Sequence, residues 1–348
     1  MIELSISFLL TAIVVFLVIL FLFAIYLLFQ HQREIRFSNT RDTFLQNHSQ
    51  HWYNYLMNDE IFSVVLVPRG RAQVAAIEKI FSSYLKNIMD EKVEHKIKEF
   101  SNLYLKKFYE KDLSSKRWSI RMNALYRIAD FQIDELLDTC QQFEKDKISE
   151  GEYFQLLKIY STFQPELFIG KIKESSVNYS ESEYRRLFVL LEDDVFIRLF
   201  EGFDSWNKNI QLAAIDTAAV KRNMQYIDKL KQLLTHEVSE IKIRALKGLY
   251  EIGVIDEIDP YVPFVKSDMW EVRLMVAKIF KHVPLNYTYA YLELLLEDEN
   301  WWVRSQAAKT IAENREGIAK LQQFMESSND QYAIEMAQET VVRRQGIK

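Results

Sequence analysis

The sequence predicts an all-α protein in which an N-terminal transmembrane helix is followed by an α-solenoid of helical hairpins. The 348 residues include only eight glycines and five prolines, too few for the turns of a strand-rich chain. A long stretch near the N-terminus carries no charge, and an apolar pattern recurs every 31 residues in the second half. We expect three parts: residues 1–37 as the transmembrane anchor and juxtamembrane segment, residues 38–112 as a helical cap, and residues 113–348 as the solenoid.

The expected anchor is the uncharged stretch at residues 4–29. At about 1.5 Å per residue it would reach roughly 39 Å, enough to cross a hydrocarbon core about 30 Å thick. A secretory signal has a shorter apolar region, of about 7–15 residues, followed by a small-residue cleavage site that this stretch lacks. We therefore expect one span of the cell membrane. Because the span contains no ionisable residue, it is expected to be an anchor and not an ion path.

The charges that flank the anchor predict its orientation. Glu3 precedes it, whereas Arg33, Arg36 and Arg41 follow it closely. Positively charged flanks stay on the cytoplasmic side, so we expect the N-terminus outside and the C-terminal domain in the cytoplasm. The single cysteine, Cys140, excludes an intrachain disulfide and suits a reducing compartment. The formal net charge of −5 gives no electrostatic reason to expect a nucleic-acid partner.

The expected cap, residues 38–112, does not show the 31-residue pattern. A helix leaving the membrane is expected to end near residues 51–59, and Pro68 with Gly70 marks the strongest break. Two amphipathic stretches follow, AQVAAIEKIFSSYLKNIM and EKVEHKIKEFSNLYLKKFYEK. We expect them to be helices that cover the first hairpin of the solenoid, because a bare end would expose its core.

The 31-residue pattern predicts one helix of each hairpin. An apolar leader is followed four and eight residues later by a small or apolar residue, and steps of four keep these side chains on one helix face. The three sets are Ile210, Ile241, Val272 and Val303; Ala214, Ala245, Val276 and Ala307; and Ala218, Leu249, Phe280 and Ile311. A last copy begins one residue early, with Ala333, Ala337 and Val341.

A second apolar pattern lies between these helices, again at 31-residue spacing. It includes Ile227, Ile258 and Tyr289, and Asp259-Pro260 is typical of a helix start. Each unit is therefore expected to be two amphipathic helices, neither of which can bury its apolar face alone. Stacking such hairpins creates one continuous core.

A Trp-x-[Ile/Val]-Arg motif opens three of these units, and we expect its residues to stack the hairpins. They are Trp118, Arg121, Trp270, Arg273, Trp301 and Arg304. Glu237, Asp268 and Glu299 each lie five residues before a basic helix position, so a series of ion pairs between successive hairpins is expected. The tryptophans lie in the first helical turn, where a large ring can cover a junction between hairpins.

The repeat resembles the HEAT family, in particular its short bacterial form of about 31 residues. The resemblance covers residues 205–345 and returns at 116–128, KRWSIRMNALYRI. At about 150–200 the arginine–alanine signature is lost, but Tyr153 and Tyr184 lie 31 residues apart, and we expect two degenerate hairpins there. Because many proteins of unrelated function share this fold, the resemblance implies an architecture and a binding role, but no reaction.

The layout of the whole chain has a broader resemblance. An anchor, a short helical region and a Trp-x-x-Arg HEAT array resemble bacterial proteins that accompany processive membrane glycosyltransferases. This resemblance implies a membrane-associated protein partner, such as a polysaccharide-synthesising glycosyltransferase.

No residue is assigned to catalysis, to a cofactor or to a metal. His48 and His51 lie three apart without a third ligand nearby, and a solvated juxtamembrane helix explains them more simply. The di-iron hydroxylases of the HEAT fold carry several His-Glu pairs, whereas this chain has one, His236-Glu237. Phycobilin lyases share the short repeat, so a HEAT-fold enzyme or ligand binder of that kind is the alternative. We expect no enzyme and no cofactor.

Tyr287 and Tyr291 are the candidate partner contacts. They replace polar residues of the neighbouring repeats, four residues apart, on what we expect to be an outer face. Exposed aromatic side chains are typical anchors of protein interfaces. The function expected from the sequence is a membrane-anchored scaffold or adaptor, whose cytoplasmic solenoid binds and positions or regulates a protein partner.

Overall fold

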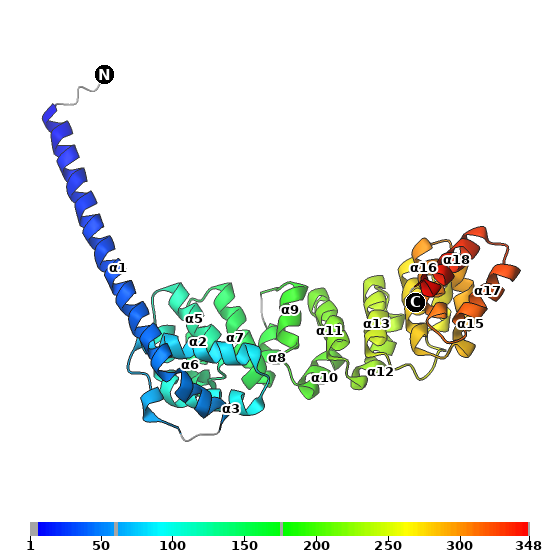
Figure 1. The fold of residues 1–348 in the computed structure, drawn as a ribbon, viewed down its shortest axis with the longest axis horizontal. Helices are drawn as coiled ribbons and strands as arrows, with labels where there is room; N and C mark the ends of the chain where they lie inside the picture. Colours follow the sequence, from blue (N-terminus) through cyan, green and yellow to red (C-terminus); the bar gives the residue numbers. More distant parts are fainter. Residues whose placement is uncertain (1–5, 59–61, 175–176, 347–348) are drawn as a thin grey trace. The chain divides into compact units, whose positions relative to one another are not determined.

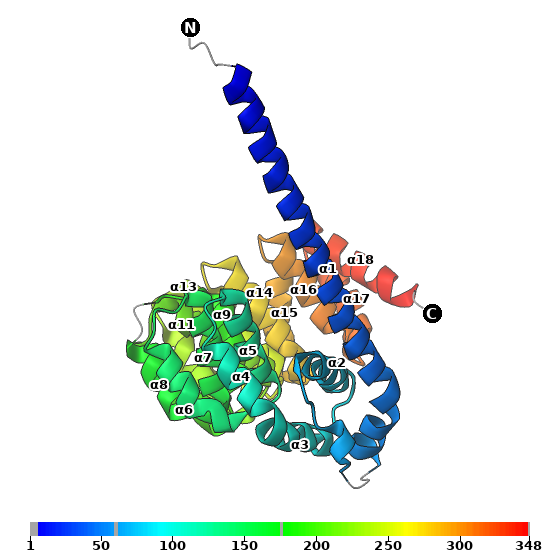
Figure 2. The same cartoon turned by 90° about the vertical axis from the view of Figure 1, so that its left-hand side faces the viewer.

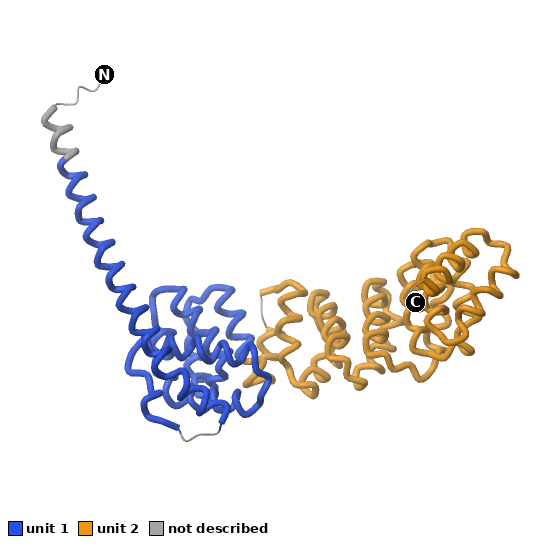
Figure 3. The backbone as a smooth tube through the Cα atoms, viewed as in Figure 1, with its two compact units in different colours: residues 1–159 blue, residues 160–348 orange. Residues whose placement is uncertain are grey.

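The computed structural model describes residues 6–58, 62–174 and 177–346, and within them all regular structure is helical. The all-α fold class is therefore confirmed, as is a helical-repeat architecture. Two compact units are present, residues 1–159 and residues 160–348 (Figure 3). The boundaries expected after residues 37 and 112 remain predictions.

One continuous helix, α1 (Ile6–Met57), contains most of the expected anchor. Residues 4 and 5 of that anchor lie outside the described part of the chain. The side chains of residues 14–29 are exposed apart from Ile25, which is partly buried. This helix is long and apolar enough to cross a membrane. Its N-terminal part projects away from the other helices of its unit in both views (Figures 1 and 2).

The C-terminal part of α1 is embedded in the cap. Phe44, Trp52 and Leu56 are buried where α1 packs on α2 (Arg71–Asn87) and α3 (Glu91–Phe100). The Trp52 ring lies 5.0 Å from the Phe81 ring and 4.9 Å from the Phe100 ring, measured between centroids. These edge-on aromatic contacts join three helices of the cap. A single helix therefore connects the exposed apolar stretch to a folded core.

The two amphipathic helices expected in the cap are present. α2 follows the break at Pro68 and Gly70, and α3 continues through a π-helical turn, Ser101–Leu105, into α4 (Lys106–Leu113). The first unit also contains α5 (Trp118–Asp130) and α6 (Leu137–Glu144), and α7 (Glu150–Phe163) crosses into the second. Cys140 is fully buried in α6, and this burial raises the pKa of its thiol to about 12.

In the second unit, the first helices of successive hairpins pack side by side (Figure 1). They are α9 (Glu181–Phe188), α11 (Lys208–Lys221), α13 (Ser239–Ile252), α14 (Trp270–Ile279), α16 (Trp301–Ala312) and α18 (Gln331–Gln345). Every leader, middle and third position expected at 31-residue spacing is buried, including those of the last copy. The small middle residues Ala214, Ala245 and Ala307 have no exposed surface, so neighbouring helices approach closely there.

The second helices are less regular than the sequence suggests. They are α8 (Pro165–Glu174), α10 (Asp193–Glu201), α12 (Ile227–Gln232), α15 (Leu285–Leu296) and α17 (Gly317–Ser327). The prediction of a helix that starts at Asp259-Pro260 is wrong, because only a 3₁₀ segment, Val262–Lys266, forms there. Pro260 and Pro263 remove two backbone donors within one turn, which disfavours a regular α-helix.

Two further expectations meet different outcomes. The degenerate region contains α7 and α8, then α9 and α10, in the order expected for two hairpins. Tyr289, expected in the core, is only partly buried. The buried face of α15 is instead formed by Thr288, Leu292, Leu295 and Leu296.

We predict that Gly317→Ala destabilises the second unit. A Cβ atom at Gly317, the first residue of α17, would lie 1.7 Å from the Ile311 carbonyl oxygen, so the backbone of α16 or α17 must move. Overpacking of this kind costs about 2–3 kcal/mol. Gly170→Ala is the control, because a Cβ there meets nothing within 4 Å. Thermal melting of the full chain in detergent should show a lower midpoint for Gly317→Ala alone; equal midpoints would contradict the close approach.

Candidate functional site

The Trp-x-[Ile/Val]-Arg motif lies at the start of a helix in each of the three hairpins that contain it. Each tryptophan is the first residue of a helix: Trp118 in α5, Trp270 in α14 and Trp301 in α16. Each arginine donates a hydrogen bond to the backbone carbonyl six residues before it. These bonds are Arg121 to Ser115 at 3.0 Å, Arg273 to Ser267 at 2.6 Å and Arg304 to Asp298 at 2.8 Å. The arginine therefore fastens the preceding turn to the first turn of its own helix.

Arg273 also joins two successive hairpins. Its Nε and Nη2 atoms donate to the two carboxylate oxygens of Asp298 at 2.5 and 2.8 Å. The two side chains are only 9% and 6% exposed, so this is a buried, bidentate ion pair. The hydrogen bond with Asp298 raises the pKa of Arg273 above its ordinary value. Glu299, one of the three acids expected to take part in the series of ion pairs, is a secondary partner at 3.4 Å and is 88% exposed.

The expected series of ion pairs changes its residues from one hairpin to the next. Lys242 lies over the Phe264 ring, 5.9 Å from its centroid, and Arg304 lies over Tyr332 at 5.6 Å. Arg244, two residues after Lys242, contacts three carboxylates. They are Glu181, Asp216 and Glu240, at 2.5, 2.9 and 3.0 Å. Ion pairs and cation–π contacts therefore join successive hairpins of this unit, but the basic residue does not occupy the same repeat position in each hairpin.

In the first unit, the motif pairs with residues exactly one repeat later. Trp118 Nε1 donates to Ser149 Oγ at 3.0 Å, and Arg121 Nε donates to Glu152 Oε1 at 2.8 Å. Glu152 is fully buried. Burial alone would raise the pKa of Glu152, but its hydrogen bonds with Arg121 and Ser149 outweigh that effect and lower it. Both contacts set the register of α5 against α7.

Two of the three motif tryptophans are more exposed than a role in covering junctions predicts, whereas Trp270 is partly buried. Trp118 is 53% exposed and Trp301 is 48% exposed. In the second unit, Trp270, Trp301 and Tyr332 recur at 31-residue spacing, and Trp302 lies beside Trp301. We call these four residues the aromatic edge. Trp302 and Tyr332 are 60% and 69% exposed, and the Trp301 and Trp302 rings meet edge-on at 4.8 Å.

Acidic side chains accompany the aromatic edge. Asp268, Glu299 and Asp330 each lie two residues before one of its aromatic residues. Asp268 and Glu299 are exposed, whereas Asp330 caps α18 by accepting a hydrogen bond from the Ala333 amide at 3.0 Å. The edge therefore combines large rings with acidic side chains, a chemistry suited to cationic side chains, and Arg304 of this chain already lies over the Tyr332 ring.

The two tyrosines selected from the sequence do not form an equally exposed pair. Tyr287 is 63% exposed. Tyr291 is partly buried, and its ring lies 6.0 Å from that of Phe280. Both lie on α15, and their role as partner contacts remains a prediction.

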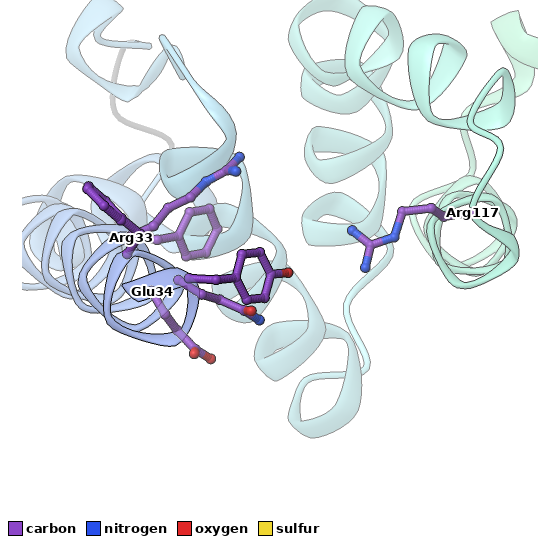
Figure 4. A pocket seen from close by; sticks show the side chains of 7 residues that line it. Arg33, Glu34 and Arg117 are labelled. Carbon is purple, nitrogen blue, oxygen red and sulfur yellow. The ribbon is translucent and has the colours of Figure 1, made fainter. Parts of the chain in front are cut away.

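A cavity of about 510 Å³ lies in the first unit, beside the end of the apolar stretch of α1 and the residues that follow it (Figure 4). Its lining residues are Tyr26, Phe29, Gln30, Arg33, Glu34, Phe37 and Arg117. Within residues 14–58, 62–174 and 177–346, no group of three or more histidine, cysteine or acidic side chains is arranged to hold a metal ion. The His48 ring instead stacks on Phe44 at 4.3 Å.

Comparison with known proteins does not assign a function to this chain. No protein-family model matches the chain. No curated protein matches it either. Among solved structures, it is similar to an engineered protein (15% identity, 79% of this chain and 91% of that chain, TM-score 0.37) and to importin beta (14%, 86% and 42%, TM-score 0.35). The match thus spans less than half of the importin beta chain, and the helical-repeat fold rests on the packing described above.

Two groups of residues escaped the sequence interpretation. Tyr332 could have been found, because it continues the 31-residue spacing of Trp270 and Trp301, and Trp302 could have been found as the neighbour of Trp301 within the motif. The pairing of Arg273 with Asp298 instead of Glu299 depends on how the turn before α16 closes, where Asp298 also accepts the Asn300 amide at 2.8 Å. That detail has no signature in the spacing.

We predict that Asp298→Ala costs about 3–5 kcal/mol of folding free energy, because it leaves the Arg273 guanidinium buried without its carboxylate. The double variant Arg273→Met/Asp298→Leu should cost less than Asp298→Ala, since no unpaired charge remains. Glu251→Ala is the control, because its partner Arg222 is 64% exposed and such pairs contribute at most about 1 kcal/mol. Denaturant melts of the full chain measure all three; equal losses for Asp298→Ala and Glu251→Ala would show that the buried pair is unimportant.

Proposed function

We propose that this protein is a single-pass membrane protein whose helical-repeat region acts as a scaffold for a protein partner. The observation that carries the anchoring is the exposed part of α1. Its side chains are apolar on every side of the helix from Val14 to Phe29. A groove on another protein covers one side of a helix, whereas a bilayer covers all of it. A lipid environment therefore accounts best for an isolated apolar helix of this length.

The orientation proposed is the one expected from the sequence, with the N-terminus outside and the repeats in the cytoplasm. Arg33, Arg36 and Arg41 all follow the apolar stretch on the same helix. They are the only clustered positive charges next to the span in the described part of α1.

Reporter fusions test this topology. A reporter at the C-terminus that is active only in the periplasm should be inactive, and one that is active only in the cytoplasm should be active. The reason is that the arginines keep the segment after the span on the cytoplasmic side. Replacing Arg33, Arg36 and Arg41 together with glutamine should weaken this preference, whereas glutamine at Lys86, Lys92 and Lys107, far from the span, should not. A soluble, evenly distributed fusion protein would refute the anchor itself.

The aromatic edge is the surface proposed for the partner. Trp301, Trp302 and Tyr332 are about half or more exposed, and Asp268 and Glu299 add negative charge beside them. We propose a partner segment rich in lysine and arginine, since such side chains pair with carboxylates and stack on aromatic rings. The anchor would hold this edge near a membrane-associated partner, and the raised local concentration would compensate for a modest individual affinity. A polysaccharide-synthesising membrane glycosyltransferase is the kind of partner that the sequence layout favours.

Purification in mild detergent, followed by mass spectrometry of proteins retained in stoichiometric amount, tests the scaffold role. We expect a co-purified partner to be lost from Trp301→Ser/Tyr332→Ser, because two contact aromatics contribute about 2 kcal/mol each, together roughly 10³-fold in affinity. Tyr287→Ser/Tyr291→Ser is the matched comparison, and loss in that variant alone would move the contact to α15. A wild-type chain that emerges alone would count against a stable scaffold complex.

A further inference from the structure

The cavity beside α1 has a defined chemistry. Six of its lining residues follow one another at helical spacing, so they share one face of α1. They are Tyr26, Phe29, Gln30, Arg33, Glu34 and Phe37. The opposite wall is Arg117, just before α5, and its guanidinium points toward α1 (Figure 4).

The cavity carries a net positive charge, because its lining includes two arginines and one carboxylate, that of Glu34. In the described part of the chain, neither Arg33 nor Arg117 forms an ion pair with a carboxylate. Glu34 offsets one of the two charges, so the cavity retains a net positive charge. Arg117 is also the N-cap residue of α5 and provides no side-chain acceptor there.

The position of the cavity along α1 is the second observation. Its lining begins at Tyr26, within the apolar stretch, and ends at Phe37, eight residues beyond Phe29. In the topology proposed above, this range crosses from the hydrocarbon into the cytoplasmic headgroup layer. Tyr26 has the ring chemistry that is enriched at this depth. The end of the cavity in the headgroup layer, at Arg33 and Arg117, is cationic, and the end in the hydrocarbon, at Tyr26 and Phe29, is apolar.

We propose that this cavity binds the phosphate headgroup of an anionic membrane lipid. Arg33 and Arg117 contact the phosphate from opposite walls, and an acyl chain follows the Tyr26 and Phe29 side of α1. The inference rests on the proposed membrane anchoring. Its consequence is that the α5 end of the first unit is held at the membrane surface by the lipid as well as by α1.

Native mass spectrometry of the full chain, extracted in detergent with phosphatidylglycerol and phosphatidylcholine in equal amounts, tests the proposal. Wild type should retain phosphatidylglycerol selectively, and Arg33→Gln/Arg117→Gln should lose at least about tenfold of this selectivity, which corresponds to about 1.4 kcal/mol. The control Arg36→Gln/Lys107→Gln removes the same charge outside the lining and should keep it. Equal loss in both double variants would mean general charge attraction and would overturn the site.

The source of the phosphate is decided separately. Inorganic phosphate, titrated calorimetrically into the lipid-free chain in a neutral detergent, should bind far more weakly than the lipid, because it lacks an acyl chain for Tyr26 and Phe29. Binding of similar strength would make this a free-anion site and reject the lipid. The reporter fusions distinguish the two failures: correct insertion without lipid selectivity refutes only this inference, whereas failed insertion refutes the proposed anchoring.

Discussion

The second unit depends on one constraint: neither helix of a hairpin can bury its apolar face without the next hairpin. The leader and middle positions of α11, α13, α14 and α16 are buried only because each helix packs on its neighbour. Stability in such an array comes mainly from contacts between adjacent repeats. In α11, α13 and α16 an alanine at the middle position sets the distance between helices, and a larger side chain there would force neighbouring helices apart.

Polar contacts act on this apolar core by fixing its register. The Arg273–Asp298 pair is almost fully buried, and burial of two charges costs desolvation that their attraction only partly offsets. The pair contributes geometric specificity, because its two parallel hydrogen bonds allow only one alignment of α14 with the turn before α16. Trp118 and Arg121 perform the same task in the first unit through Ser149 and Glu152.

The sequence was informative where periodicity determines burial. The repeat positions of the first helices, the break at Pro68 and Gly70, and the cap helices followed from spacing and turn chemistry. Spacing failed where local geometry prevailed: two prolines reduced one expected helix to the Val262–Lys266 segment, and Tyr289 turned partly out of the core. The choice of ion-pair partners depended on side-chain reach across turns, which a linear pattern does not encode.

The continuity of α1 has a mechanical consequence. A helix of 52 residues is about 78 Å long, and no flexible linker separates its exposed apolar part from the end held by Trp52. A long apolar helix adapts to bilayer thickness by tilting. In the proposed arrangement, a tilt of α1 would therefore rotate the cap by the same angle. The orientation of the first unit relative to the membrane would then depend on the thickness of the bilayer.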